Sequence, residues 1–288
     1  MKKPLILGID FNNVFMSSVF NENETNSKGV VTSGVKTFFY RLKYFKETFN
    51  PDYFCIANDL SRELTFRRKI YKPYKSHRKP RDPSIIEQME ITTQLLNLAG
   101  YKLLNNPVFE ADDILGMVSK YATEQDMNMI IISADKDLYQ LINDNVVIFS
   151  HKGKELIDSN WVHNNYRINI NQWIDFKILQ GDKSDNIPGF EGIGEVTALR
   201  LLQKYGNIEN IYNHLNALKP AVRDSLKFGS CRIPLVKELV TIVTDYNSIE
   251  FNLSMLEQHE PFMQEVSELL NELELHQLYD VMKQLTTL

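Results

Sequence analysis

The chain has 288 residues, of which 43% are hydrophobic and 24% charged, and its formal net charge is −5. This composition is typical of a soluble globular protein that buries a large core. We find no apolar run near the roughly 20 residues of a membrane helix and no signal peptide, so we expect a cytoplasmic monomer without a membrane partner. Two distant cysteines and six dispersed histidines form no zinc or disulfide pattern.

Short apolar runs with β-branched or aromatic residues alternate with segments whose apolar residues recur at helical spacing. We expect strands at 4–10, 53–59, 127–135 and, more briefly, 146–150, and helices at 35–49, 83–100 and 111–125. This alternation predicts an α/β domain with a mostly parallel central sheet flanked by helices. From about residue 160 the pattern is mostly helical, so we expect two parts, 1–160 and 161–288, that pack directly on each other.

Positive charge is concentrated between Arg62 and Arg81. Nine Lys or Arg residues stand there against one acid, which gives this segment +8 and leaves −13 for the rest of the chain. Phe66, Tyr71 and Tyr74 interleave with these cations, and a surface that follows phosphates and stacks on bases has this composition. We therefore favour phosphate contact over the alternative, an ordinary solvated charged face.

Acidic residues close the expected strands and open the helix that follows residue 110. Ligands of parallel sheets bind beyond the carboxyl ends of the strands, so the side chains there should meet at one rim: Asp10, Asp59, Glu110, Asp112, Asp113, Asp135 and Asp137. Asp182 and Asp185, three residues apart in GDKSDN, add a further pair at a turn or helix start. The plain alternative for the acids after residue 109 is that they complement the dipole of a first helical turn. Converging carboxylates repel one another, however, unless divalent cations neutralise them. Oxygen ligands without His or Cys point to Mg²⁺ or Mn²⁺. There are more carboxylates than one ion needs, which suggests two ions.

The run 179–211 contains the turn Gly192–Ile193–Gly194, followed by an amphipathic helix. The turn follows no expected strand, which disfavours a dinucleotide-binding fold. A glycine turn between two helices can bring backbone N–H groups against a DNA phosphate at a helix N-terminus. We favour this contact over a turn that serves only helix packing.

Several motifs, in order along nearly the whole chain, resemble the 5′ nuclease or flap endonuclease family. This family includes the 5′-3′ exonuclease domain of bacterial DNA polymerase I and stand-alone phage and bacterial exonucleases. The motifs are GIDFNN, FRRKIYKPYKSHR, FEADD, SADKDLYQL and GDKSDNIPGFEGIGEVTALRLL. The resemblance implies a PIN-like 5′ nuclease fold. It also implies a basic helical arch at about 62–95 that passes a 5′ single strand, and a helix-hairpin-helix element at about 179–206 that grips duplex DNA and can hold K⁺.

By this resemblance, Asp10, Asp59, Glu110 and Asp112 hold a first metal ion, and Asp135, Asp137 and Asp185 a second, with Asp113 and Asp182 bordering them. The implied catalytic cations are Lys75 and Arg78, and the implied DNA contacts are Arg67, Arg68, Tyr74, Gly192, Gly194 and Thr197. The family commonly has Gly after the first metal-site Asp, Arg seven residues beyond that Asp, and Lys in the hairpin. Here these positions are Phe11, Ser17 and Val196. The missing Arg at Ser17 affects how the 5′ end is held, and the missing Lys at Val196 affects how tightly the duplex is gripped.

The expected function is a divalent-metal-dependent, structure-specific 5′ nuclease of DNA replication and repair, acting on 5′ ends, flaps or junctions by a two-metal mechanism. A DNA polymerase partner would act in trans. A PIN-type ribonuclease would share the acidic rim but would not explain the hairpin or the basic segment. A non-catalytic branched-DNA-binding protein would not need so many acids. A haloacid-dehalogenase-like phosphatase would need Asp where Asn12 stands.

Overall fold

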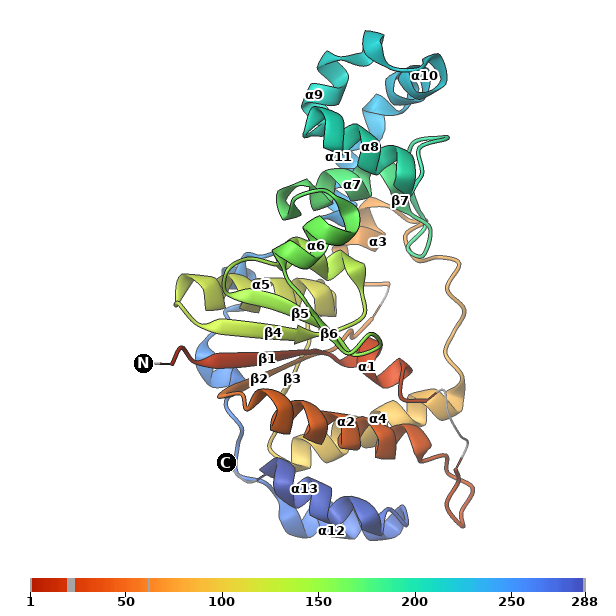
Figure 1. The fold of residues 1–288 in the computed structure, drawn as a ribbon. Helices are drawn as coiled ribbons and strands as arrows, with labels where there is room; N and C mark the ends of the chain where they lie inside the picture. The colour runs from red at the N-terminus through yellow and green to blue at the C-terminus, as the bar shows by residue number, and fades with distance from the viewer. Residues whose placement is uncertain (1, 20–23, 62, 287–288) are drawn as a thin grey trace.

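The computed structural model describes residues 2–19, 24–61 and 63–286. Its centre is a six-stranded sheet in the order β3-β2-β1-β4-β5-β6 (Figure 1). Five strands run parallel and β6 is antiparallel: β1 (Leu5–Asp10), β2 (Tyr53–Ala57), β3 (Leu103–Leu104), β4 (Asn128–Ile132), β5 (Val146–Ser150) and β6 (Glu155–Ile157). The predicted mostly parallel sheet is confirmed. The short strands β3 and β6 were not predicted, because two or three residues give no periodicity to read.

Helices cover both faces of the sheet. Along β1, alternate side chains point to opposite faces: Ile6 packs in a cluster with α5 (Ala111–Glu124), whereas Leu7 and Ile9 pack with α2 (Ser33–Phe49) and α4 (Pro83–Leu98). The three predicted helices are therefore present, within two residues at each end. Within the described ranges, no helix is long and apolar enough to cross a membrane.

The segment expected as a helical arch over 62–95 is not helical in its middle, between residues 71 and 82. Only α3 (Phe66–Ile70) precedes a strap, residues 71–82, which consists of turns and extended chain and runs down one side of the molecule to α4 (Figure 1). Prolines at 73, 80 and 83 lack the N–H that a helix needs and disfavour helical conformation in the residue before them. The arch expectation is corrected accordingly, since α4 packs in the core through Met89, Leu95 and Leu96.

A helical lobe stands beyond the β5 and β6 edge of the sheet (Figure 1). It contains α6 (Ser159–Tyr166), α7 (Trp173–Gln180), α8 (Glu195–Tyr205), α9 (Ile208–Asn213), α10 (Pro220–Gly229) and α11 (Ile233–Val240). Between α7 and α8 lies a two-stranded ribbon, β7 (Gly181–Asp182) and β8 (Ile187–Pro188). The hairpin turn at 189–194 therefore follows β8 rather than a helix.

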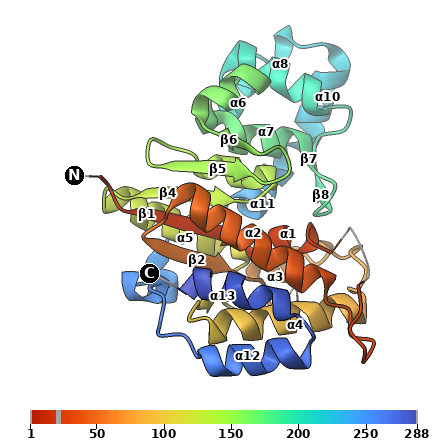
Figure 2. The same cartoon turned by 60° about the horizontal axis from the view of Figure 1, so that its bottom comes forward.

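The chain then returns to the far side of the core. Helices α12 (Met263–Glu272) and α13 (Tyr279–Thr286) pack beside α4 and α2 (Figure 2). Their buried faces, including Leu270 and Leu285, belong to the same hydrophobic cluster as Phe38 of α2. Residues 161–288, expected as one helical region, thus divide between the lobe and a third layer on the α/β core.

Candidate active site

Four carboxylates come together where the parallel strands end. β1 pairs in register with both β2 and β4, with Ile9 opposite Ile56 and Ile132, so all three strands end at one edge. The four acids, from these strand ends and from the start of α5, line one cleft of about 910 Å³: Asp10, Asp59, Asp112 and Asp135. The same cleft is lined by Glu110 and by Lys75 and Arg78 of the strap.

Local hydrogen bonds position these acids. Asp10 is the N-cap of α1 (Phe11–Met16), and its Oδ1 accepts a bond from the Asn13 N–H at 3.1 Å while its Oδ2 accepts one from Ser133 Oγ at 2.9 Å. The Asp59 carboxylate accepts from the Ala111 N–H at 2.7 Å. A capping Asp after a strand lets the chain turn directly into a helix, so the carboxylates stand on rigid backbone.

The electrostatics of the rim favour a cation. The pKa of Asp10 is raised to about 7, chiefly by burial and also by the charges of Asp59 and Asp135, while the hydrogen bonds from Asn13 and Ser133 act in the opposite direction. Burial, followed by the charges of Asp135 and Asp10, raises the pKa of Asp112 well above its ordinary value. Neighbouring carboxylates that resist ionisation in this way are stabilised as anions by a positive charge placed among them.

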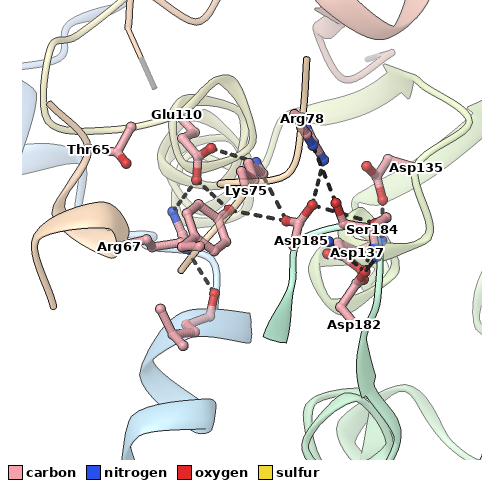
Figure 3. A network of polar contacts seen from close by, with 12 residues as sticks. Thr65, Arg67, Lys75, Arg78, Glu110, Asp135, Asp137, Asp182, Ser184 and Asp185 are labelled. Atoms are coloured by element: carbon pink, nitrogen blue, oxygen red, sulfur yellow. Dashed lines mark hydrogen bonds and ion pairs between the residues drawn. The ribbon is translucent and has the colours of Figure 1, made fainter. Parts of the chain in front are cut away.

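Glu110 and Asp185 meet cations that come from the strap (Figure 3). Lys75 Nζ lies 2.5 Å from Glu110 Oε1 and 3.5 Å from Asp185 Oδ2, and Arg78 Nη2 lies 2.5 Å from Asp185 Oδ1. Burial opposes the charge on Glu110, but Lys75 and Arg67 outweigh it and hold the pKa of Glu110 below its usual value. The Lys75 backbone, with φ of 51°, donates its N–H to the Asp185 carbonyl at 2.9 Å, which holds the ammonium in the cleft.

Two residues expected to contact DNA are buried instead. Arg67 binds both oxygens of Asp113, at 2.6 and 2.7 Å, and the side chains of these two residues are 4% and 0% exposed. Tyr74 is buried and donates its hydroxyl to Glu110 at 2.8 Å. The expectation that Arg67 and Tyr74 meet phosphate or bases is therefore wrong, because the fold uses both groups to compensate buried carboxylates.

Two further expectations change for the same reason. Both oxygens of Asp113 are engaged, by Arg67, by the Glu110 N–H at 3.1 Å and by the Val243 N–H at 2.9 Å. Asp113 therefore supports the N-terminus of α5 and is corrected from a residue bordering the metals to a structural one. Arg68 is only partly available to DNA, since its guanidinium donates to the carbonyls of Lys72 and Tyr74.

A lysine that the sequence reasoning missed neutralises another acidic pair. Lys177 of α7 contacts Asp137 and lies 2.5 Å from Asp182. Burial raises the pKa of Asp137 to about 7, with Lys177 acting in the opposite direction, whereas Lys177 outweighs burial at Asp182 and lowers its pKa. A single Lys inside the apolar run WIDFKILQ was the available signal, since a buried lysine requires a carboxylate partner.

The glycine turn presents open backbone to solvent. Gly192 has φ of 73°, which favours glycine, and neither Gly192 nor Gly194 has an atom near the position of an added Cβ. Thr197 is half-buried on the first turn of α8, and Val196 is 61% exposed. The turn borders a separate cleft of about 1470 Å³ next to Asp182, so a strand that touches the turn can approach the acidic residues.

The donor set suits a hard divalent cation. The acidic residues of the rim offer carboxylate oxygens, and Mg²⁺ and Mn²⁺ prefer such ligands. Within the described ranges, no group of three or more His, Cys, Asp and Glu side chains converges closely enough to form a complete metal site by itself.

Comparison with known proteins identifies the family. The family model for the 5′-3′ exonuclease N-terminal resolvase-like domain matches residues 6–167, and that for the 5′-3′ exonuclease C-terminal SAM fold matches residues 168–264. A 5′-3′ exonuclease of Halalkalibacterium halodurans is 35% identical over 272 residues, covering 89% of each chain. A thermostable DNA polymerase I of Thermus thermophilus is 36% identical over 222 residues, covering 77% of this chain and 26% of that protein.

The fold agrees with that assignment. A solved structure of T5 5′-exonuclease with bound divalent metal ions (zinc) superimposes with a TM-score of 0.72 at 17% identity, covering 98% of this chain and 97% of that one. The chain spans about a quarter of the length of the DNA polymerase I relative but nearly all of the exonuclease relative. The chain therefore belongs to the 5′-3′ exonuclease family.

Proposed function

We propose that the protein hydrolyses phosphodiester bonds of DNA at free 5′ ends, 5′ flaps or junctions, with divalent cations as cofactors. The observation that carries this proposal is the convergence of Asp10, Asp59, Asp112 and Asp135 in one cleft that also receives Lys75. Converging carboxylates next to a lysine form a site that can bind cations and phosphate together. Family membership and the metal ions bound to T5 5′-exonuclease support the same function.

Two groups of carboxylates would hold the cofactor, for which we propose Mg²⁺, with Mn²⁺ as a substitute. Asp10, Asp59, Glu110 and Asp112 would hold a first ion, and Asp135, Asp137 and Asp185 a second. When bound, the two ions lower the pKa of the attacking water and stabilise charge on phosphorus and on the leaving oxygen. Lys177 and Arg78 pair with Asp137 and Asp185 of the second group, whereas Lys75 and Arg67 pair with Glu110 of the first, so each group keeps part of its negative charge for an ion.

The chain's own cations act on the phosphate. Lys75 lies over the rim with its ammonium directed at Glu110, where it can stabilise charge that grows on a phosphoryl oxygen in the transition state. Arg78 is held beside Asp185 at the mouth of the cleft, and its planar guanidinium suits positioning of the strand. The two residues thus divide chemistry and positioning between them.

Duplex DNA would be held by the backbone of the turn at Gly192 and Gly194, with Thr197 at the start of α8. These groups are open to an approaching phosphate, and phosphate contacts of this kind position a duplex without reading its sequence. A K⁺ ion at this turn stays a prediction. We further propose that the protein works in the cytoplasm as a monomer, on substrates shared with a DNA polymerase.

The test is cleavage of a 5′-labelled flap DNA with and without Mg²⁺, with product length read on a gel. Asp135→Asn should remove most of the Mg²⁺-dependent cleavage and retain or improve DNA binding, because it deletes a ligand and a negative charge that faces phosphate. Asp126→Asn is the matched control, since Asp126 is exposed and paired with Lys3. Full activity of Asp135→Asn would refute the metal assignment, and cleavage confined to an RNA flap would favour a ribonuclease.

A further inference from the structure

The cleft with the acidic rim has a further wall that is built from elements outside the strap. This wall consists of the end of α1, one residue of α2 and the turn between β5 and β6: Met16, Ser17, Arg41, His151, Lys152 and Lys154. We call these residues the basic wall. None of them was expected to contact substrate from the sequence, where the basic charges of the strap dominated.

The cations of the basic wall differ from those of the strap in their pairing. Lys75 and Arg78 are ion-paired with carboxylates of the site. Among the residues that the structure describes, Arg41, Lys152 and Lys154 form no ion pair. The basic wall therefore holds positive charge that is not compensated by a neighbouring carboxylate, and it holds this charge at the mouth of the cleft.

Two of these cations, Arg41 and Lys152, lie close enough to His151 to affect its charge. Burial, together with the charges of Arg41 and Lys152, lowers the pKa of His151 to about 4. His151 is therefore neutral near pH 7 and adds no charge of its own. An anion bound among these cations would be stabilised by their charge, as a cation would be at the rim.

Asn13 ties the basic wall to the rim. Its side-chain oxygen accepts a hydrogen bond from the Ala134 N–H at 3.0 Å and lies 2.8 Å from His151 Nε2, while its own N–H donates to Asp10 at 3.1 Å. One residue thus connects the cap of α1, the end of β4 and the β5–β6 turn. Because these links are rigid, the spacing between the basic wall and the rim is set by the fold.

Arg41 also supplies a guanidinium at a position where the sequence lacks one. The family resemblance places Arg where this chain has Ser17. Arg41 reaches over from α2 and donates Nη1 to Ser17 Oγ and, at 3.4 Å, to the Val14 carbonyl. The remaining N–H groups of its guanidinium form a planar fork, which is suited to a phosphate.

We propose that Arg41, Lys152 and Lys154 form a subsite for a DNA backbone phosphate next to the scissile one. This subsite rests on the proposed function, because it positions the strand whose neighbouring phosphate meets the rim. Its residues bind and orient the strand without touching the reacting atoms. They are therefore positioning residues, and their removal should weaken binding at one phosphate rather than abolish chemistry.

The test combines protein variants with DNA in which single phosphates are replaced by neutral methylphosphonates. Dissociation constants for a 5′-flap DNA are measured in EDTA by fluorescence anisotropy. Arg41→Ala should weaken binding about 10-fold, the scale of losing one charged hydrogen-bonding contact. Lys43→Ala is the matched control on the same helix, because Lys43 is paired with Glu47, and it should bind as the wild type does.

The methylphosphonate scan identifies the phosphate. At one position flanking the scissile bond, the neutral substitution should weaken binding by the wild type about 10-fold and binding by Arg41→Ala clearly less, because one of the contacts to that phosphate is already lost. Equal further losses in both proteins at every position would overturn the subsite. The double variant Lys152→Ala/Lys154→Ala, on an exposed turn where misfolding is not expected, should show the same loss of sensitivity at the same phosphate, and full sensitivity there would also overturn it.

Two further outcomes separate the subsite from the proposed function. If the wild type cleaves the flap DNA with Mg²⁺ and Arg41→Ala binds equally well, only the subsite is refuted. If the wild type neither binds nor cleaves the DNA, the proposed function fails first. Arg41→Lys keeps the charge and should retain part of the affinity. If this variant has an unchanged melting temperature but binds as weakly as Arg41→Ala, the guanidinium fork is needed and charge alone does not suffice.

Discussion

Replacing Arg67 by Ala should destabilise the protein far more than replacing its neighbour Arg68. The Arg67 guanidinium binds Asp113 through both oxygens, contacts Glu110 at 3.1 Å, and donates to the carbonyls of Leu239 and Thr241, each at 2.9 Å. It thus joins α3, the start of α5 and the end of α11. The change would leave the fully buried Asp113 carboxylate without a counter-charge.

The magnitude follows from burial. Removing one partner of a buried ion pair costs about 3–5 kcal/mol of unfolding free energy, and Arg67 is 4% exposed. Arg68 is 23% exposed and its partner Glu63 is 75% exposed, so this solvent-screened pair is worth about 0–1 kcal/mol. Arg67→Ala should therefore be less stable than Arg68→Ala by roughly 3 kcal/mol, given these two ranges.

Urea denaturation followed by circular dichroism gives both free energies, with DNA affinity measured against salt concentration in parallel. We expect Arg67→Ala to shift the denaturation midpoint strongly, and the salt dependence of the folded variant to match that of the wild type. The reasoning would be refuted if Arg67→Ala were as stable as Arg68→Ala and reduced the salt dependence by about one phosphate contact, because Arg67 would then face DNA.

Three further predictions concern the rim, the strap and the turn. Because the pKa of Asp10 is raised to about 7, the folded state binds its proton more tightly than the unfolded state and loses stability as pH rises from about 4 to 7, by up to roughly 4 kcal/mol. In EDTA at pH 8, Asp10→Asn should therefore have a higher melting temperature than the wild type, and Mg²⁺ should raise the melting temperature of the wild type only. A wild type that melts at the same temperature as Asp10→Asn in EDTA, or at a higher one, would contradict the destabilising burial of the Asp10 charge. Lys75→Ala should slow single-turnover cleavage by about 10²-fold or more, whereas Lys79→Ala should change mainly affinity, and equal small effects would remove Lys75 from the chemistry. Gly192→Ala, at φ of 73°, should cost about 1 kcal/mol of strain and weaken duplex binding measured by anisotropy, while unaltered affinity would exclude the turn from the DNA contact.

Local patterns in the sequence determined the elements and the location of the acidic residues. The strands and helices could be predicted because apolar periodicity depends on near neighbours along the chain. Asp10, Asp59 and Asp135 could be placed at one edge because parallel strands in one sheet end on the same side. The ordered motifs around them were sufficient to indicate the 5′ nuclease family, and the family match agrees.

Only the tertiary structure decided which charges are free to meet a substrate. Arg67 and Arg68 are adjacent and chemically identical, yet one is buried against Asp113 and the other lies at the surface. The basic segment looked like the DNA contact, but part of its charge compensates carboxylates that are distant in sequence, whereas Arg41 remains without an ion pair among the described residues. The pairing and desolvation of a charge depend on residues brought together by folding, and neither can be read from its neighbours in the sequence.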